Sequence, residues 1–149
     1  MTQPGDPPSA LETRAEQLGL KYTRGRTMTP NSHLALEAGE FAAEHPAHRD
    51  AFHRRLFRSF FTDLEDISEI EVLVRVGEES GLPPGELREA LATRRFERQV
   101  DDGINWSRSV GVTAVPTFIF DEKYGVVGAQ PVEALMKVME EMGKVPKQA

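Results

Sequence analysis

Apolar residues recur at helical spacing over most of the chain, and capping or stop residues divide the pattern into segments. Ser9 with Glu12 fits a capping box, and Gly19 follows the first segment. Ser68 with Glu71 fits a second capping box, for a helix that Gly81 ends. We therefore expect helices over Ser9–Leu18, from Asn31 or Ser32 to about Glu44, from Pro46 through Phe60, from Ser68, from Pro83 or Pro84, and over Phe96–Ser109.

The apolar stripes of these helices predict which side chains form the core. The predicted core positions are Phe52, Leu56, Phe57, Phe60, Ile67, Ile70, Leu73, Val74, Leu87, Leu91, Phe96, Val100 and Ile104, with Ser107 on the same side of the last helix. Trp106 lies off this stripe. It is either part of a contact surface or a sign that its helix is buried on two sides, and the second interpretation is favoured.

The pattern changes after residue 110. Thr117–Phe120 and Tyr124–Val127 are short β-prone runs around Asp121-Glu122-Lys123, which predicts a β-hairpin with a three-residue loop. An amphipathic helix then follows from Pro131 to about Gly143, with Val132, Leu135, Met136 and Met139 on its apolar side.

Composition narrows the function classes. Hydrophobic residues make up 39% and charged residues 28% of the 149 residues, as expected for a folded domain. The net charge of −6 argues against a nucleic-acid partner, and Arg94, Arg95 and Arg98 are interpreted as a solvated helix face. No apolar run is long enough to cross a bilayer, and Met1–Pro8 lacks the pattern of a signal peptide. These features predict a cytoplasmic protein without a membrane partner.

The chemistry-bearing residues are few. The sequence has no cysteine, which excludes disulfides, thiolate metal sites and cysteine nucleophiles. His33, His45, His48 and His53 are interpreted as exposed surface histidines, and no metal or other cofactor is expected. Asp63, Glu65 and Asp66 are interpreted as an acidic loop and helix start, favoured by the helix macrodipole, rather than as a catalytic pair.

One stretch resembles a known family. Gly111-Val112-Thr113-Ala114-Val115-Pro116-Thr117-Phe118-Ile119-Phe120 looks like the loop and strand that carry the cis-proline of thioredoxin-fold proteins. Tyr124-Gly125-Val126-Val127-Gly128-Ala129-Gln130-Pro131 is similar to the second hairpin strand and last helix of DsbA-like proteins, especially the FrnE-type subgroup. Pro30-Asn31-Ser32, the Phe52–Phe61 helix and Asp66-Ile67-Ser68 resemble the helical insertion of that subgroup.

The resemblance implies an α/β fold: an incomplete thioredoxin-like domain, mostly helical insertion with a C-terminal hairpin and helix. It implies a helical insertion domain (9–110) and a thioredoxin-like hairpin and helix (111–143), followed by a tail (144–149). The prolines and glycine of residues 1–8 predict a flexible lead. It also implies that Val115–Pro116 is cis and that Ala114, Val115, Pro116, Thr117 and Asn31 bind an extended peptide. Without the resemblance, a trans proline at the start of an edge strand is the favoured alternative.

The family pattern departs from this sequence in one respect that bears on function. A Cys-x-x-Cys at a helix start, within a strand–helix–strand unit, has no counterpart here. Three hypotheses remain open. The chain is a non-catalytic or truncated member that binds an extended peptide or a partner chain, a component of a DsbA-like disulfide oxidoreductase whose Cys-x-x-Cys half lies on another chain or is missing from the gene model, or a glutathione-dependent enzyme like 2-hydroxychromene-2-carboxylate isomerase.

Assembly is the last expectation from the sequence. A hairpin with one open edge and a helix that carries Leu135, Met136 and Met139 needs further apolar surface to cover it. We therefore expect a homodimer or larger homo-oligomer. The alternative is a monomer in which the helical segment folds over the hairpin.

Overall fold

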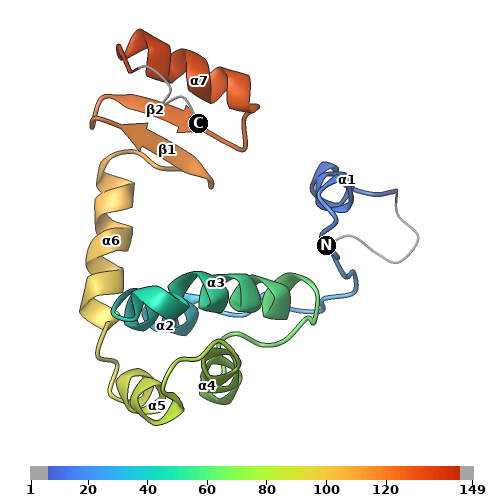
Figure 1. The fold of residues 1–149 in the computed structure, drawn as a ribbon, viewed down its shortest axis with the longest axis vertical. Helices are drawn as coiled ribbons and strands as arrows, with labels where there is room; N and C mark the ends of the chain where they lie inside the picture. Colours follow the sequence, from blue (N-terminus) through green and yellow to red (C-terminus); the bar gives the residue numbers. More distant parts are fainter. Residues whose placement is uncertain (1–6, 145–149) are drawn as a thin grey trace. The chain divides into compact units, whose positions relative to one another are not determined.

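The structure is a computed structural model that describes residues 7–144. The chain divides into two compact units, with the division between Asp102 and Gly103. The predicted lead and tail lie mostly outside the described residues. The elements, shown in Figure 1, are α1 (Ala10–Gln17), α2 (His33–Ala43), α3 (Pro46–Phe61), α4 (Ile70–Glu79), α5 (Pro84–Ala92), α6 (Glu97–Ser109), β1 (Thr117–Phe120), β2 (Tyr124–Val127) and α7 (Val132–Glu141).

Local capping signals set most helix boundaries. The predicted capping box of α1 is confirmed: Glu12 N donates to Ser9 Oγ at 3.3 Å, and Ser9 N donates to Glu12 Oε2 at 2.6 Å. Gly19 follows in the left-handed region at φ +69°, which glycine adopts without steric cost. Pro46 begins α3 and Pro84 begins α5, where the missing N–H costs nothing.

The second predicted capping box is wrong. The N–H and hydroxyl of Ser68 both donate to Asp66 Oδ1, at 2.9 Å and 2.5 Å, and α4 begins only at Ile70. An aspartate two residues upstream offers Ser68 a closer acceptor, so a local turn forms before the helix. Glu69 then stands at the N-cap without a side-chain hydrogen bond to the helix.

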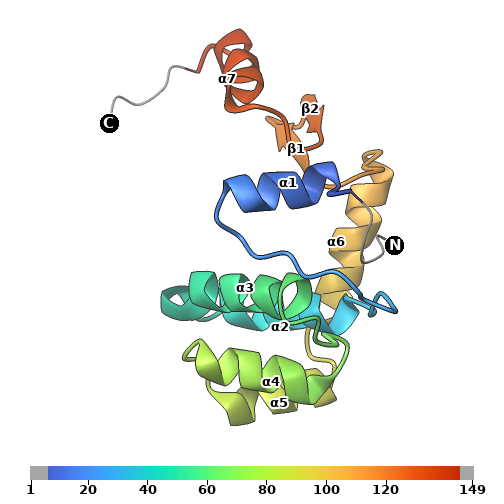
Figure 2. The same cartoon turned by 90° about the vertical axis from the view of Figure 1, so that its right-hand side faces the viewer.

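Helices α2 to α5 pack together as the core of the first unit. Helices α2 and α3 lie side by side in Figures 1 and 2, and α4 and α5 pair beside them. Predicted core positions Phe52, Leu73, Leu87 and Leu91 are fully buried, as is Phe41. Burying a side chain of this size stabilises the fold by roughly 1.5–3 kcal/mol.

Two aromatic predictions are wrong. Phe57 belongs to the predicted core stripe of α3, yet 64% of it is exposed, because it lies about 100° around the helix from Leu56, outside the core-facing stripe. Trp106 is 55% exposed, so α6 does not bury it on a second side.

The predicted hairpin is confirmed residue for residue. Strands β1 and β2 pair antiparallel, with Thr117 opposite Val127 and Phe120 opposite Tyr124. Asp121 and Glu122 close the loop at positive φ, and Lys123 N donates to Phe120 O at 3.0 Å. No side chain between residues 103 and 144 is buried. A narrow two-stranded surface gives α7 too little area to bury its apolar stripe.

The arginine group is not a plain solvated face. Arg94 contacts the buried carboxylate of Glu37 at 2.8 Å, Arg95 pairs with Glu44 at 3.0 Å, and Arg98 pairs with Asp102 at 3.7 Å. Arg94 and Arg95, which lie just before α6, therefore connect the start of α6 to α2. Arg94 contacts α2 itself, and Arg95 contacts Glu44 at the C-terminal end of α2.

The acidic loop also has arginine partners. Arg55 Nη1 lies 3.2 Å from Asp63 Oδ2, and Arg75 Nη2 lies 2.6 Å from Glu65 Oε1. These ion pairs connect Asp63 and Glu65 to α3 and α4.

Among residues 7–144, none of the helices has both the length and the apolar character of a membrane span.

Gly77 is a tight point between α4 and α5. A Cβ added there would lie 2.4 Å from Leu87 Cδ2, a fully buried side chain with little room to move. We expect Gly77→Ala to destabilise the protein by about 1–3 kcal/mol. Gly85→Ala in α5 is the matched control, because nothing lies within 4 Å of its added Cβ. Urea unfolding of both variants measures the difference, and equal midpoints would contradict it.

Candidate functional site

The segment from Ala114 to Thr117 leads into β1. Its Val115–Pro116 peptide bond is cis, which is the isomer that the family resemblance implies. Thr117 Oγ1 donates to Ala114 O at 2.6 Å, and Gly128 N donates to Pro116 O at 2.7 Å. These two hydrogen bonds hold the segment on both sides of Val115.

Val115 is the most exposed apolar residue of this segment, at 88%. Neither its N–H nor its carbonyl forms a hydrogen bond with any described residue, whereas the carbonyls of both neighbours have partners. A donor and an acceptor on one exposed residue beside a strand can pair with the backbone of a passing polypeptide. The segment is therefore chemically suited to strand addition.

Asn31 belongs to the other compact unit. Its Oδ1 accepts a hydrogen bond from His33 N at 2.9 Å, immediately before the first turn of α2. The amide side chain thus has a local role in starting the helix. Its role in peptide binding stays a prediction.

The helical unit carries a groove between α2 and α3, with a volume of about 520 Å³. Its lining is mostly apolar, and Leu36 and Phe57 are its most exposed apolar members, at 47% and 64%. The lining residues are Thr29, Pro30, Ser32, Ala35, Leu36, Gly39, Glu40, Ala43, Arg49, His53, Leu56, Phe57, Phe60, Phe61 and Ile67.

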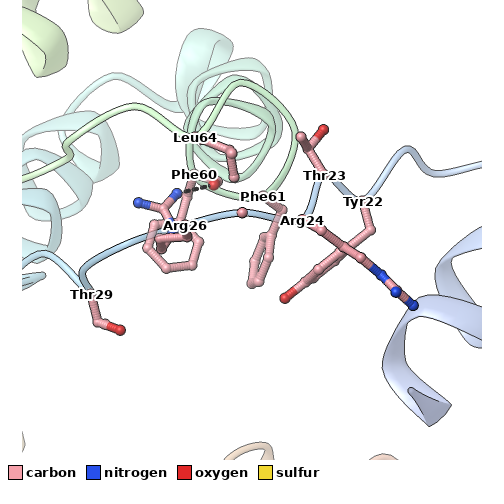
Figure 3. Close-up of a pocket in the computed structure, with 9 residues that line it drawn as sticks. Tyr22, Thr23, Arg24, Arg26, Thr29, Phe60, Phe61 and Leu64 are labelled. Carbon is pink, nitrogen blue, oxygen red and sulfur yellow. Dashed lines mark hydrogen bonds between the residues drawn. The ribbon is translucent and has the colours of Figure 1, made fainter. Parts of the chain in front are cut away.

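A smaller pocket of about 190 Å³ adjoins this groove under the 22–29 segment (Figure 3). The guanidinium of Arg26 lies 4.1 Å from the centroid of the Phe60 ring. It also donates to the carbonyls of Phe60 and Glu65. The hydroxyl of Thr23 is buried without a hydrogen-bond partner. The protein's own carbonyls therefore already hold the Arg26 head group in this pocket.

Arg24 closes the pocket on the side of α1. Its Nε donates to Glu12 Oε1 at 2.5 Å, and its Nη2 donates to Glu12 Oε2 at 3.2 Å. The Arg24 hydrogen bond, followed by those from Ser9, lowers the pKa of the Glu12 carboxyl from 4.5 to about 2. Glu12 thus combines the cap of α1 with a bidentate contact to the following segment.

The histidines are partly buried, which corrects the expectation that they lie exposed on the surface. The ring of His45 packs against Phe41 with centroids 4.6 Å apart, and its Nδ1 lies 3.0 Å from Phe41 O. Among residues 7–144, no group of three or more histidine, aspartate or glutamate side chains is placed to hold a metal ion.

Sequence reasoning missed the groove. The sequence feature that could have indicated it is the number of aromatic residues in α3, which is more than one helix face can hold. Phe57 and Phe61 are four residues apart, and their rings stack with centroids 6.2 Å apart. Phe52 and Leu56 already fill the core-facing stripe, so Phe57 and Phe61 define a second apolar face.

Comparison with known proteins places the chain in a family. Residues 8–140 match the model of the DSBA-like thioredoxin domain. The chain belongs to the DsbA-like thioredoxin domain family. The family match confirms the expected fold, which is mostly helical and ends in a two-stranded antiparallel hairpin and a final helix.

Two relatives give the scale of the match. The crystal structure of a probable DsbA oxidoreductase from Streptomyces coelicolor superposes with a TM-score of 0.79 and is 27% identical, covering 92% of this chain and 60% of that one. The uncharacterized protein YwbO of Bacillus subtilis is 28% identical over 116 residues, which are 76% of this chain and 58% of YwbO. The chain therefore spans about three-fifths of the length of each relative, and membership of the FrnE-type subgroup stays a prediction.

The Arg24 contact can be tested through the titration of Glu12. We expect Arg24→Ala to raise the Glu12 pKa from about 2 towards 4.5, because the largest cause of the shift is removed. Arg14→Ala takes the same charge from α1 without touching this contact, and should leave the pKa low. Carboxyl NMR titration reads both variants.

The same shift has a consequence for stability. The folded pKa lies below the unfolded value, so the contribution of Glu12 is present above pH 4.5 and is lost as the pH falls towards about 2. This acid-dependent loss should be smaller in Arg24→Ala than in Arg14→Ala. An unchanged Glu12 titration in Arg24→Ala would show that the contact does not form.

Proposed function

We propose that this DsbA-like domain binds an extended polypeptide through Ala114–Thr117 and carries out no dithiol chemistry of its own. The observation that carries the proposal is the backbone of Val115, which is exposed and offers a donor and an acceptor without partners among the described residues. The flanking hydrogen bonds of Ala114 O and Pro116 O keep this short edge in one conformation. A preformed edge lowers the entropy cost of adding a strand.

The chemistry excluded by the sequence supports the same proposal. Disulfide exchange requires a thiolate that attacks a sulfur atom, and the 149 residues contain no cysteine. What the chain retains of the family pattern is the loop before β1, not the redox centre. Recognition of a polypeptide backbone needs no thiol, so this chain can bind a polypeptide without any redox centre.

Backbone pairing can be tested with a matched pair of peptides. The probe is a fluorescein-labelled decapeptide of alternating valine and threonine with terminal lysines, and its partner carries N-methyl groups on alternate amides. We expect the N-methylated peptide to bind at least about tenfold more weakly, because it cannot form the pairing hydrogen bonds. Fluorescence anisotropy measures both affinities.

Two substitutions at Val115 locate the binding. Val115→Pro removes the amide N–H, whereas Val115→Thr keeps it in a side chain of similar shape. We expect the proline variant to lose the difference between the two peptides and the threonine variant to keep it. Equal binding of both peptides by the unmodified chain would refute the proposal.

A second candidate function rests on the comparison of lengths. The chain covers 60% of a probable DsbA oxidoreductase at a TM-score of 0.79, so it has the geometry of part of a larger domain. It would then be a component of a DsbA-like disulfide oxidoreductase whose Cys-x-x-Cys lies elsewhere.

The expected homo-oligomer and the cytoplasmic location also stay predictions.

Redox assays separate the two candidates. The purified chain should not accelerate the reduction of insulin by dithiothreitol above the buffer rate, since it has no cysteine. Turnover by the chain alone would contradict this. If a Cys-x-x-Cys polypeptide turns over faster with an equal concentration of this chain than without it, the second candidate is supported instead.

A further inference from the structure

A histidine bridges two helices within the first unit. His33, in the first turn of α2, has its Nδ1 2.9 Å from Glu37 Oε1 on the same helix. Its Nε2 lies 3.1 Å from Asp101 Oδ1 on α6, 68 residues away in the sequence. Glu37 is fully buried, whereas Asp101 is more than half exposed. The ring therefore spans from the interior to the surface.

Arg94 completes the cluster from the segment before α6. Its Nη2 lies 2.8 Å from Glu37 Oε1, 3.0 Å from His33 Nδ1 and 3.1 Å from Glu97 Oε1. Glu37 Oε2 and Arg94 Nε are buried without hydrogen-bond partners. Such a cluster is sensitive to the gain or loss of one proton, because buried polar atoms without partners are costly.

The neutral and the protonated ring make different contacts with these neighbours. A neutral imidazole donates from one nitrogen and presents a lone pair at the other. Protonated at Nε2 alone, it donates to Asp101, and its Nδ1 lone pair faces Glu37 and accepts from Arg94 Nη2, 3.0 Å away. Protonated at Nδ1 alone, it would turn the Nε2 lone pair towards Asp101. Only the imidazolium donates to both carboxylates at the observed distances.

The charges around His33 favour the same form. From α2 it faces Glu37, from the segment before α6 it faces Arg94, and from α6 it faces Asp101, with Glu97 paired to Arg94. Three carboxylates thus surround one guanidinium, so a neutral ring leaves a net charge of −2 and an imidazolium leaves −1. The remaining charges of the first turns of α6, Arg98 and Asp102, pair with each other.

We propose that His33 is a proton-operated latch that holds the first turns of α6 on α2. With the proton, the ring is a cation that donates to a carboxylate on each helix; without it, the hydrogen bond to Asp101 loses its charge assistance and the ring no longer donates to Glu37. Helix α6 runs across the division between the two units. Protonation of a single side chain therefore sets how firmly the helical unit holds the helix that continues into the hairpin unit.

The direction of the pH dependence follows from the cluster. The hydrogen bond to Asp101, then those from Glu37, raise the pKa of His33 above 6.5, against desolvation and Arg94. A raised folded pKa means that the latch is fully closed below pH 6.5 and opens as the pH rises through the folded value.

Amide hydrogen exchange tests the latch in the whole chain. Protection of residues 98–102 is compared between the unmodified protein and His33→Gln at pH 5.5 and pH 8.5. We expect the protection of residues 98–102 in the unmodified protein, relative to His33→Gln, to be severalfold greater at pH 5.5 than at pH 8.5, because only the protonated ring makes charge-assisted hydrogen bonds. His53→Gln, which removes a histidine from α3, should match the unmodified protein at both values.

A second pair of variants keeps the test decisive if His33→Gln fails to fold. Asp101→Asn removes a charge at an exposed position, and Asp102→Asn removes the same charge one residue further on. NMR titration of the His33 ring should show a lower pKa in Asp101→Asn and little change in Asp102→Asn. A His33 pKa at or below 6.5 in the unmodified protein, an equal effect of both variants, or equal pH dependence of protection in His33→Gln would overturn the latch.

Discussion

Helix α2 lies where three other helices meet, and its small residues allow them to approach closely. Ala38 and Ala42 are completely buried and Ala35 nearly so, while α2 contacts α3, α4 and α5. Glu37 on the same helix is also completely buried. The carboxylate must therefore be met by protein groups, because a buried charge without partners is strongly unfavourable. Arg94 and His33 meet this need and thereby connect α6 to the core.

The two units differ in what holds them together. The helical unit buries a continuous set of aliphatic and aromatic side chains, whereas residues 103–144 bury none. The hairpin has its backbone hydrogen bonds and a defined register, but its apolar side chains, among them Val115, Val127 and Val132, stay exposed. Backbone pairing without burial contributes little net stability. This is a surface on which contact with another polypeptide would be favourable.

The chain belongs to the DsbA-like family but lacks the cysteines that dithiol exchange requires. The DsbA-like thioredoxin domain is shown by the match over residues 8–140, yet the atoms that perform dithiol exchange in such chemistry are absent from the sequence. The loop before β1 is retained, with its exposed donor and acceptor at Val115. A fold supports several functions when its sites are independent of one another. Here the donor and the acceptor of Val115 are backbone groups, which are present without any thiol.

The sequence by itself determined the elements whose signals are local. The capping box at Ser9, the prolines at the starts of α3 and α5, and the hairpin around residues 121–123 depend on neighbouring residues, and the structure has them as predicted. Within the candidate site, the isomer at Pro116 followed from a motif.

Only the tertiary structure decided which faces are covered and which distant charges meet. It exposed Phe57, which helical periodicity had assigned to the core, and Trp106, which lies off the apolar stripe of its helix, because periodicity does not say which other helices are present to cover a face. It brought His33 and Asp101 within 3.1 Å across 68 residues, a contact that has no local signal. It also replaced the capping box at Ser68 with a turn on Asp66, where two local acceptors competed for the same donor.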